Sequence, residues 1–423
     1  MASQLSLARF VQRAVRGVKR PQSRALSSLL VQSQPKLASL PHFPVIKILP
    51  TSQDDNEITA VLSMRALTRL LTMLENPSPG AGLAAPPENS CFSFTSIPGK
   101  GIGMIATTRI SPGDLILSER PVLVLPQNLK ASYGVDPHPV HEVWPLLSSN
   151  QREKIESLRN AFASRETLLV NPETWSKIGL ISTNALNARL PVATENGKED
   201  YAGIFPSIAR CNHSPNAMYD FNPKTFSASL IATSPIEDAE EITITYIDPC
   251  LSQSARKALL LESYDFECEC PACVSSDIAS SDRRRMRISN FMDHLEVPSQ
   301  KNEFKDDIIP YPNVALTHPS TTPSILRRVV YVADAIFRLI EEEGLHALIP
   351  SSPIYQVVER AAFASVLLGD KDVFDIWSRQ ASIYSRTARW MHNGKPLLSE
   401  DQWEQAFNDP EAYFATWGRN SDS

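Results

Sequence analysis

The sequence predicts an α+β protein with a β-rich domain, a helical insertion within that domain and an α-helical carboxyl domain. Three observations lead to this fold class: short segments rich in β-branched and aromatic residues, a polar helix-like stretch that interrupts them, and long helical periodicity near the carboxyl end. The 423 residues are 42% hydrophobic and 21% charged, which suits two or three folded domains. No run of eighteen apolar residues occurs, so the sequence excludes a membrane-spanning helix.

Residues 1–53 form a basic leader that differs from the rest of the chain in charge. They hold eight basic residues and no acidic residue. The whole chain, in contrast, has a net charge of −6, and this negative charge argues against a protein that binds nucleic acid directly. An acid-free end rich in Arg and Ser is typical of a mitochondrial import segment, with a solvated basic tail as the alternative. The expected location is the mitochondrion, with the cytoplasm or nucleus as alternatives. Arginines that a helix would carry on one stripe are Arg9, Arg13, Arg16, Arg20 and Arg24.

Residues 54–90 are expected to hold one helix and a linker. Apolar residues recur at helical spacing from Glu57 to Leu74, and the Pro-Ser-Pro-Gly run at residues 77–80 ends the pattern. The β-rich domain is expected over residues 91–264, and a tight turn at residues 111–114 separates two of its early strands. The early strands are expected at Cys91–Phe94, Gly101–Ala106, Leu115–Ser118 and Val122–Leu125.

The helical insertion is expected over about residues 127–200. Ser149 is expected to cap a helix at Gln151–Ala163, and a second helix is expected at Pro172–Leu186. Strands then return at Ala217–Phe221, Thr225–Thr233 and Glu241–Ile247.

The carboxyl domain is expected over residues 282–423 as antiparallel helix pairs, whose role is to scaffold or to present a groove. An arginine cluster at residues 283–287 favours the solvated face of a helix over a nuclear import signal. Its long helices are expected at Ile325–Glu343, Tyr355–Leu368 and Val373–Met391.

The strongest chemical signal is a run of three cysteines at Cys268, Cys270 and Cys273. Three thiolates this close together can converge on one tetrahedral Zn²⁺, which still requires a fourth ligand. Three unrelated loop cysteines are the less favoured interpretation, because cysteine is rare and only six occur in the chain. Nothing nearby resembles a metal-activated water site, so the zinc would be structural.

Two further elements carry polar or glycine-rich sequence. The turn at residues 99–103 is followed by a strand rather than a helix, so the dinucleotide and P-loop motifs are excluded. The second element is Asn212-His213-Ser214 followed by Pro215-Asn216. Alone, its histidine would more often be a hydrogen-bonded structural residue than a catalyst.

Taken in this order, the elements resemble SET-domain protein lysine methyltransferases over about residues 91–274. The resemblance rests on the glycine turn leading into residues 110–116, the Asn-His-Ser motif, the run at residues 240–246, and Phe266 with the three cysteines. The split layout is similar to the SET-and-MYND branch and its fungal relatives. No cysteine lies between residues 127 and 171, so no MYND finger is expected. The resemblance implies a zinc-binding post-SET tail at residues 265–274.

The resemblance also implies S-adenosylmethionine as cofactor and a lysine-containing peptide or protein as substrate, with the chain acting as a monomer. Tyr246 and Tyr264 match the tyrosines that line the lysine channel. Such walls suit methyl transfer, which needs alignment and exclusion of water rather than a nucleophilic side chain. Residues that match cofactor-binding positions are Lys100, Gly101, Ile102, Gly103, Asn184, Asn212, His213 and Phe266.

The sequence departs from the family pattern in two places. The family carries a cysteine after Asn-His-Ser that commonly supplies the fourth zinc ligand, and here Cys211 is the first substitute and Cys250 the second. Ala239 stands where the turn before Glu240 usually has glycine. The alternative function is therefore a catalytically silent SET-like interaction scaffold, and a less favoured one is a thiol-redox or metal-storage protein. The sequence names neither the substrate nor the degree of methylation.

Overall fold

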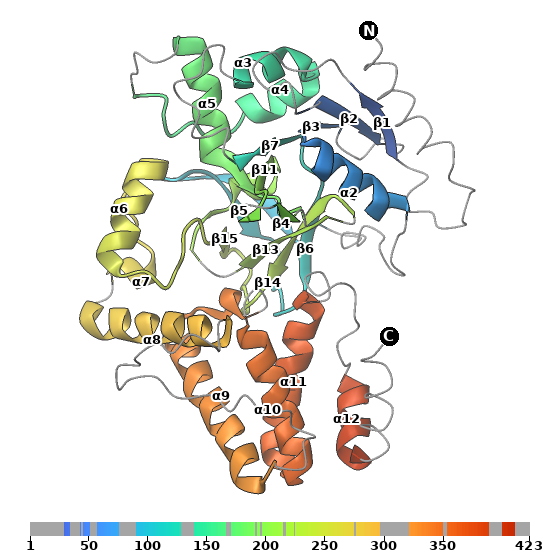
Figure 1. Ribbon diagram of the computed structural model, residues 1–423. Helices are drawn as coiled ribbons and strands as arrows, with labels where there is room; N and C mark the ends of the chain where they lie inside the picture. Colours follow the sequence, from blue (N-terminus) through green and yellow to red (C-terminus); the bar gives the residue numbers. More distant parts are fainter. Residues whose placement is uncertain are drawn as a thin grey trace.

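The computed structural model describes residues 29–33, 43, 45–50, 57–75, 90–127, 139–165, 171–190, 193–194, 197–214, 217–223, 225–274, 276–296, 321–349, 353–388 and 400–410. The predicted α+β class is confirmed. Strands lie at the centre of the molecule, the helices of the insertion lie above them in the view of Figure 1, and the carboxyl helices lie below. Among the described residues, no helix is both long and apolar enough to cross a membrane.

The largest sheet has six strands, and its first three come from the amino-terminal part of the chain. These three form an antiparallel meander, and β3 continues the sheet by pairing in parallel with β7. Val45, Ile46 and Ile48 are at most 1% exposed, so β2 belongs to the core. In spatial order the strands are β1 (Leu29–Ser33), β2 (Val45–Pro50), β3 (Ile58–Val61), β7 (Leu123–Pro126), β11 (Tyr201–Ile204) and β8 (Ala185–Asn187).

These strands correct two expectations about the amino-terminal region. The leader predicted over residues 1–53 contains β1 and β2, and its arginine stripe lies outside the described residues. The helix expected from Glu57 begins at Met64, as α2 (Met64–Glu75), and Ile58–Val61 is a strand. The helical spacing gave a wrong prediction for Ile58–Val61 because β3 pairs with β2 on one edge and β7 on the other, and all four of its residues are buried.

Two smaller sheets carry most of the remaining strands. In the four-stranded sheet, the short parallel pair β12–β15 places Asn212 opposite Thr243 and His213 opposite Ile244. The strand predicted at Gly101–Ala106 matches β5, whereas β15 ends at Ile244, three residues earlier than predicted. The four-stranded sheet has the order β12 (Asn212–His213), β15 (Glu241–Ile244), β5 (Gly101–Ala106) and β4 (Phe92–Ile97). The other strands are β6 (Leu115–Glu119), β13 (Ala217–Asn222) and β14 (Ser227–Ala232) in one sheet and β9 (Ala193–Thr194) and β10 (Gly197–Lys198) in another.

The insertion is helical, as predicted, and packs through an apolar cluster that includes residues of β7 and β11. Ser148 rather than Ser149 caps its middle helix, where the Ser148 side chain and Gln151 form a reciprocal capping box. That helix ends at Glu156, well before the predicted end at Ala163. The insertion contains α3 (Pro139–Val143), the 3-10 helix η2 (Trp144–Leu146), α4 (Ser149–Glu156) and α5 (Pro172–Asn184).

The carboxyl region is helical, and α9, α10 and α11 lie side by side (Figure 1). Its arginine cluster is not simply a solvated face, because Arg285 is 1% exposed and pairs with Glu343 at 2.7 Å. A buried charge requires such a partner, and Arg284 reaches the same carboxylate at 2.6 Å. The helices after β15 are α6 (Gln253–Tyr264), α7 (Pro271–Val274), α8 (Ile278–Glu296), α9 (Pro323–Glu343), the 3-10 helix η4 (His346–Leu348), α10 (Ile354–Leu368), α11 (Lys371–Ala388) and α12 (Glu400–Asn408).

Candidate functional site

A cavity of about 810 Å³ lies between the four-stranded sheet, the insertion and the segment that follows α6. The structure brings almost all of the predicted site residues to this one cavity, although they come from segments far apart in the sequence. The exceptions are Gly103, which lies one position further along β5, and Cys273, which is buried and does not line the cavity. The predicted residues that line the cavity are Lys100, Gly101, Ile102, Asn184, Cys211, Asn212, His213, Tyr246, Tyr264, Phe266, Cys268 and Cys270.

The glycine turn between β4 and β5 forms one edge of the cavity. Gly99 and Gly101 have φ angles of 75° and 78°. A residue with a side chain would be strained in this left-handed conformation, whereas glycine is not. Gly103 is needed for a different reason, because a Cβ there would lie 2.3 Å from Ile97 Cδ1 and 3.0 Å from Asn212 Nδ2. Ala239 has a φ of 64°, so the turn before β15 keeps the left-handed geometry that glycine would favour.

Asn212 reaches the cavity through a short 3-10 helix, η3 (Ile208–Arg210), which directly precedes β12. The buried carboxylate of Glu119 accepts hydrogen bonds from the backbone N–H groups of Ser207 and Ile208 at 3.0 and 3.1 Å. Burial raises the pKa of Glu119, and these N–H groups partly offset that rise. The start of η3 is thereby fixed, and with it the position of Asn212.

Asn212 and Lys100 meet at one carboxylate, that of Glu241. The Asn212 amide donates to Glu241 Oε1 at 2.7 Å, and Lys100 Nζ lies 2.9 Å from Glu241 Oε2. Sequence reasoning missed Glu241 as a site residue, because it was assigned only to the run that forms a strand.

Three aromatic side chains follow one another along the cavity wall. The ring centroids of Tyr246 and Tyr264 are 4.6 Å apart, and that of Phe266 lies 6.5 Å from Tyr246. Tyr246 donates its hydroxyl to the carbonyl of Cys211 at 2.6 Å. Burial raises the pKa of both tyrosines, so both remain neutral phenols at neutral pH.

Side chains of the insertion form hydrogen bonds to the end of α6. These bonds fix the position of the segment that carries Tyr264 and Phe266. Asp265 lies between them in the left-handed conformation that ends the helix. Arg159 donates to the Asp265 carbonyl at 3.2 Å, and Arg165 donates to the Glu262 carbonyl at 2.7 Å. Cations at the last carbonyls of a helix also interact favourably with its dipole.

Asn184 and His213 lie at the cavity, and one nitrogen of each is hydrogen-bonded within the protein. The buried Asn184 amide donates to the carbonyls of Arg159 and Leu180 at 2.7 and 2.8 Å, which ties the insertion together beside the cavity. His213 Nδ1 accepts from the Tyr246 N–H at 3.1 Å. Burial lowers the pKa of His213 to about 4, so its ring is neutral at physiological pH.

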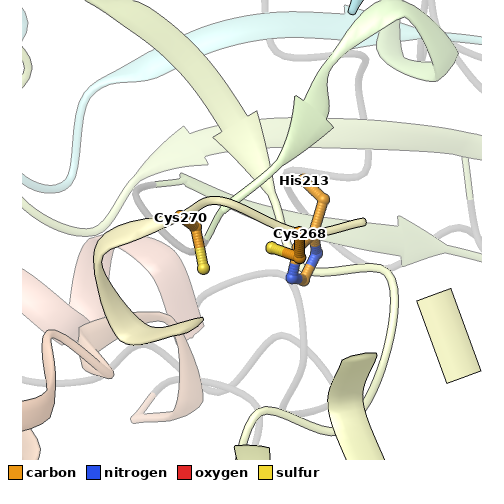
Figure 2. Close-up of side chains that lie close together, drawn as sticks. All are labelled: His213, Cys268 and Cys270. Atoms are coloured by element: carbon orange, nitrogen blue, oxygen red, sulfur yellow. The ribbon is translucent and has the colours of Figure 1, made fainter. Parts of the chain in front are cut away.

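The cysteine loop closes the same end of the cavity. One ligand atom from each of His213, Cys268 and Cys270 lies within 4.8 Å of the other two. Figure 2 shows these three side chains close together. The pKa of Cys273 is lowered because the thiols of Cys268 and Cys270 donate to its sulfur and Arg256 lies beside it. The three sulfurs therefore converge, and their donor set suits Zn²⁺.

The structure places neither predicted fourth ligand with Cys268 and Cys270. Cys211 Sγ is buried in the core, 3.9 Å from the sulfur of Met104 on β5, and it is absent from the group that could hold a metal. Cys250, the second substitute, packs with the helices of the carboxyl region. The further side chain that lies with Cys268 and Cys270 is His213 on β12.

The comparisons with known proteins agree with this geometry. Residues 101–247 match the family model described as SET domain. The chain contains a SET domain. The resemblance predicted from the motifs is confirmed by relatives that share this region.

The relatives of the SET domain are named as lysine methyltransferases. The chain is 30% identical over 191 residues to histone-lysine N-methyltransferase set5 of Schizosaccharomyces pombe, which covers 44% of this chain and 52% of that protein. It is 39% identical over 79 residues to protein-lysine N-trimethyltransferase SMYD5 of Gallus gallus, which covers 18% of this chain and 19% of that protein. It is 34% identical over 107 residues to histone-lysine N-methyltransferase SMYD3 of Homo sapiens, which covers 25% of this chain and 23% of that protein. The chain thus spans about half the length of the first relative and less of the others.

A solved structure described as the SET domain of LSMT bound to lysine and AdoHcy covers 82% of this chain and 92% of its own. It is 14% identical, with a TM-score of 0.26. The match to the SET domain ends at residue 247, so Tyr264, Phe266 and the cysteine loop lie beyond it.

Proposed function

We propose that this chain is an S-adenosylmethionine-dependent methyltransferase that acts on lysine side chains of proteins. The proposal is carried by one observation: the glycine turn, Asn212, His213, Phe266 and the two tyrosines line a single cavity in a chain with a SET domain. The names of the relatives as lysine methyltransferases support the substrate class.

The reaction requires the lysine amine to be aligned with the methyl group and requires no nucleophilic side chain of the enzyme. The cofactor supplies a methyl group on a positively charged sulfur, and in-line displacement by a lysine amine transfers it. Tyr246 and Tyr264 are half-buried neutral phenols that present ring faces to a cation and help to exclude water. Their apolar surroundings lower the pKa of an entering amine, which favours its nucleophilic neutral form.

Cys268, Cys270 and Cys273 would hold a structural Zn²⁺, with His213 as the nearest further donor. A neutral imidazole has one free lone pair, and that of His213 accepts the Tyr246 N–H, so ligation requires the ring to release this bond. Substitution by Co²⁺ tests the ligand set: three sulfurs with one nitrogen give a different d–d spectrum from three sulfurs with water. The variant His213→Ala should change that spectrum if the imidazole binds.

Cofactor binding separates the enzyme from the silent scaffold. We expect S-adenosylhomocysteine to bind the parent chain and to bind Asn212→Ala at least about tenfold more weakly, measured by calorimetry, because the amide contributes polar contacts at the cavity. Labelled methyl transfer to a protein extract should be lost in the same variant. A parent chain that binds no S-adenosylhomocysteine would favour the scaffold.

For location, we propose that residues 1–28 act as a mitochondrial import leader. Support comes from their Arg-rich, acid-free composition and from the core position of β2, which a longer leader would remove. Residues 1–28 fused to a fluorescent protein should direct it to mitochondria. Uniform cytoplasmic or nuclear fluorescence would contradict this.

A further inference from the structure

Arg256 is a buried cation on α6, beside the cysteine loop. Its side chain is 3% exposed, and its guanidinium donates to the carbonyls of Leu251 and Ala272, the second at 3.0 Å. Ala272 belongs to the cysteine loop and precedes Cys273, whose sulfur also lies beside the guanidinium. Arg256 therefore contacts the loop at its backbone and at one of its thiols.

No carboxylate among the described residues pairs closely with this cation. A charge taken out of water is costly unless an opposite charge lies close to it. The carboxylate in ion-pair contact with Arg256 is that of Asp282 on α8, at the long distance of 3.9 Å, and its side chain is 28% exposed. Its Oδ1 also accepts the backbone N–H of Gln253 at 2.8 Å. Arg256 is thus incompletely compensated by Asp282.

A zinc–thiolate centre would supply the missing charge. Three thiolates and one Zn²⁺ leave one negative charge when the fourth donor is neutral, as the His213 imidazole or a water molecule would be. Arg256 supplies one positive charge on the Cys273 side of the loop. The buried guanidinium and the buried metal centre would therefore neutralise each other.

We propose that Arg256 is the counter-charge of the zinc centre and the positioning residue of its loop. This inference rests on the structural zinc of the proposed function and names a residue outside the ligand set. Gln253 assists from the same helix, because its side-chain amide donates to the Cys273 carbonyl at 2.7 Å. Groups that contact metal ligands in this way typically contribute about ten- to a hundredfold in metal affinity.

The helix that carries Arg256 also carries part of the tail of the cavity. α6 begins beside α8, where Gln253 donates to Asp282, and it ends at Tyr264, which lines the cavity. α6, α7 and α8 follow one another down one side of the molecule in Figure 1. Arg256 therefore ties the metal loop to the helix whose end positions Tyr264 and Phe266.

Substitutions at position 256 separate the charge from the hydrogen bond. The readout is the Zn²⁺ affinity of the full chain, measured by competition with a chromophoric chelator. Arg256→Lys keeps the charge and should lose no more than about threefold in affinity. Arg256→Gln keeps a hydrogen-bond donor without the charge and should bind Zn²⁺ at least about tenfold more weakly. Equal affinities in Arg256→Lys and Arg256→Gln would contradict a counter-charge.

Asp282→Asn is the matched control, because it removes the opposite charge of the same ion pair. Asparagine keeps a side-chain oxygen that can accept the Gln253 N–H. Zinc affinity should stay within about threefold of the parent, since the metal centre rather than Asp282 is the partner of Arg256. Losses as large in Asp282→Asn as in Arg256→Gln would show a purely structural ion pair and overturn the inference.

Excess metal distinguishes weak zinc binding from a chain that does not fold. At Zn²⁺ concentrations well above its dissociation constant, Arg256→Gln should bind S-adenosylhomocysteine within about threefold of the parent. Its Co²⁺ form should give the parent d–d spectrum, because the ligands are unchanged. A variant that excess Zn²⁺ does not restore, or one with full zinc affinity, would overturn the inference.

Failure of the proposed function has a different signature. A parent chain that binds Zn²⁺ but no S-adenosylhomocysteine would remove the methyltransferase and leave the zinc measurements at position 256 valid. A parent chain that binds no Zn²⁺ would overturn this inference and leave S-adenosylhomocysteine binding to be judged by itself.

Discussion

The cavity has two walls that are built in different ways. The sheet wall, defined by the glycine turn, Asn212 and Glu241, lies within the SET domain match and is held by the pairing of β5, β12 and β15. The tail wall, defined by Tyr264, Phe266 and the cysteine loop, lies beyond that match. It depends on one helix end, two arginines and three convergent thiols. The sheet wall is therefore preformed, whereas the tail wall is conditional on contacts that can be removed one at a time.

Loss of the metal should give the largest effect, because it releases the tail wall. In Cys270→Ser we expect bound zinc to fall from about one per chain toward zero, with both S-adenosylhomocysteine and 5′-methylthioadenosine binding at least about a hundredfold more weakly. Elemental analysis and calorimetry measure these effects. Cys91→Ser, which changes a thiol outside the loop, is the matched control. Full affinity in a zinc-free Cys270→Ser chain would show that the tail wall does not need the metal.

Removal of the Phe266 ring should have the next largest effect. The resemblance to SET-domain enzymes implies that the cofactor's adenine stacks on Phe266. A base stacked on an aromatic side chain gains about 1–3 kcal/mol, so Phe266→Ala should weaken both ligands by roughly ten- to a hundredfold. Phe266→Tyr keeps the ring and should stay close to the parent. Zinc content should be unchanged in both variants. Equal affinity in Phe266→Ala would place the adenine elsewhere.

The arginine contacts of the tail wall should contribute less. Arg165→Met removes hydrogen bonds to the Glu262 and Leu261 carbonyls, and partly exposed bonds of this kind are each worth about 1 kcal/mol. We expect a roughly threefold to tenfold loss of affinity for both ligands, measured by calorimetry. Arg338→Met, which breaks an exposed pair on α9, is the control and should change nothing.

A substitution in the helical carboxyl region should change the free energy of unfolding and leave the affinity for both ligands unchanged. Burial raises the pKa of Glu359 on α10 to about 7, above its ordinary value of 4.5. Folded protein then binds this proton more tightly than unfolded protein, so stability falls as pH rises from about 4.5 to about 7. Glu359→Gln should raise the free energy of unfolding at pH 8 by up to about 2 kcal/mol and change it little at pH 4. Denaturant unfolding at both pH values measures this, and an equal effect at both would contradict it.

The sequence predicted most residues of both walls and missed Glu241 in the sheet wall. The Gly101–Ala106 strand and the Asn212-His213 motif are local patterns whose residues carry their own conformational signals. Glu241 was missed because its role comes from Lys100, 141 residues earlier in the chain, which no local pattern shows.

The errors share a cause, which is that side-chain direction and long-range partners are set by tertiary structure. Cys211 follows the 3-10 helix η3 with its thiol against Met104, and sequence adjacency to the Asn-His motif could not indicate that direction. Arg285 was expected in solvent because its partner, Glu343, lies 58 residues away. Ile58–Val61 has helical spacing in sequence and becomes a strand only through its two neighbouring strands.

The amino-terminal meander also limits where the proposed import leader can end. Cleavage between β1 and β2 would leave the outer N–H and C=O groups of β2 unpaired along one edge of the largest sheet. Bare edges of this kind invite pairing with other chains and aggregation. For the proposed import leader of residues 1–28, a cut that keeps β2 paired must therefore fall upstream of Leu29, where no described strand would lose its neighbour.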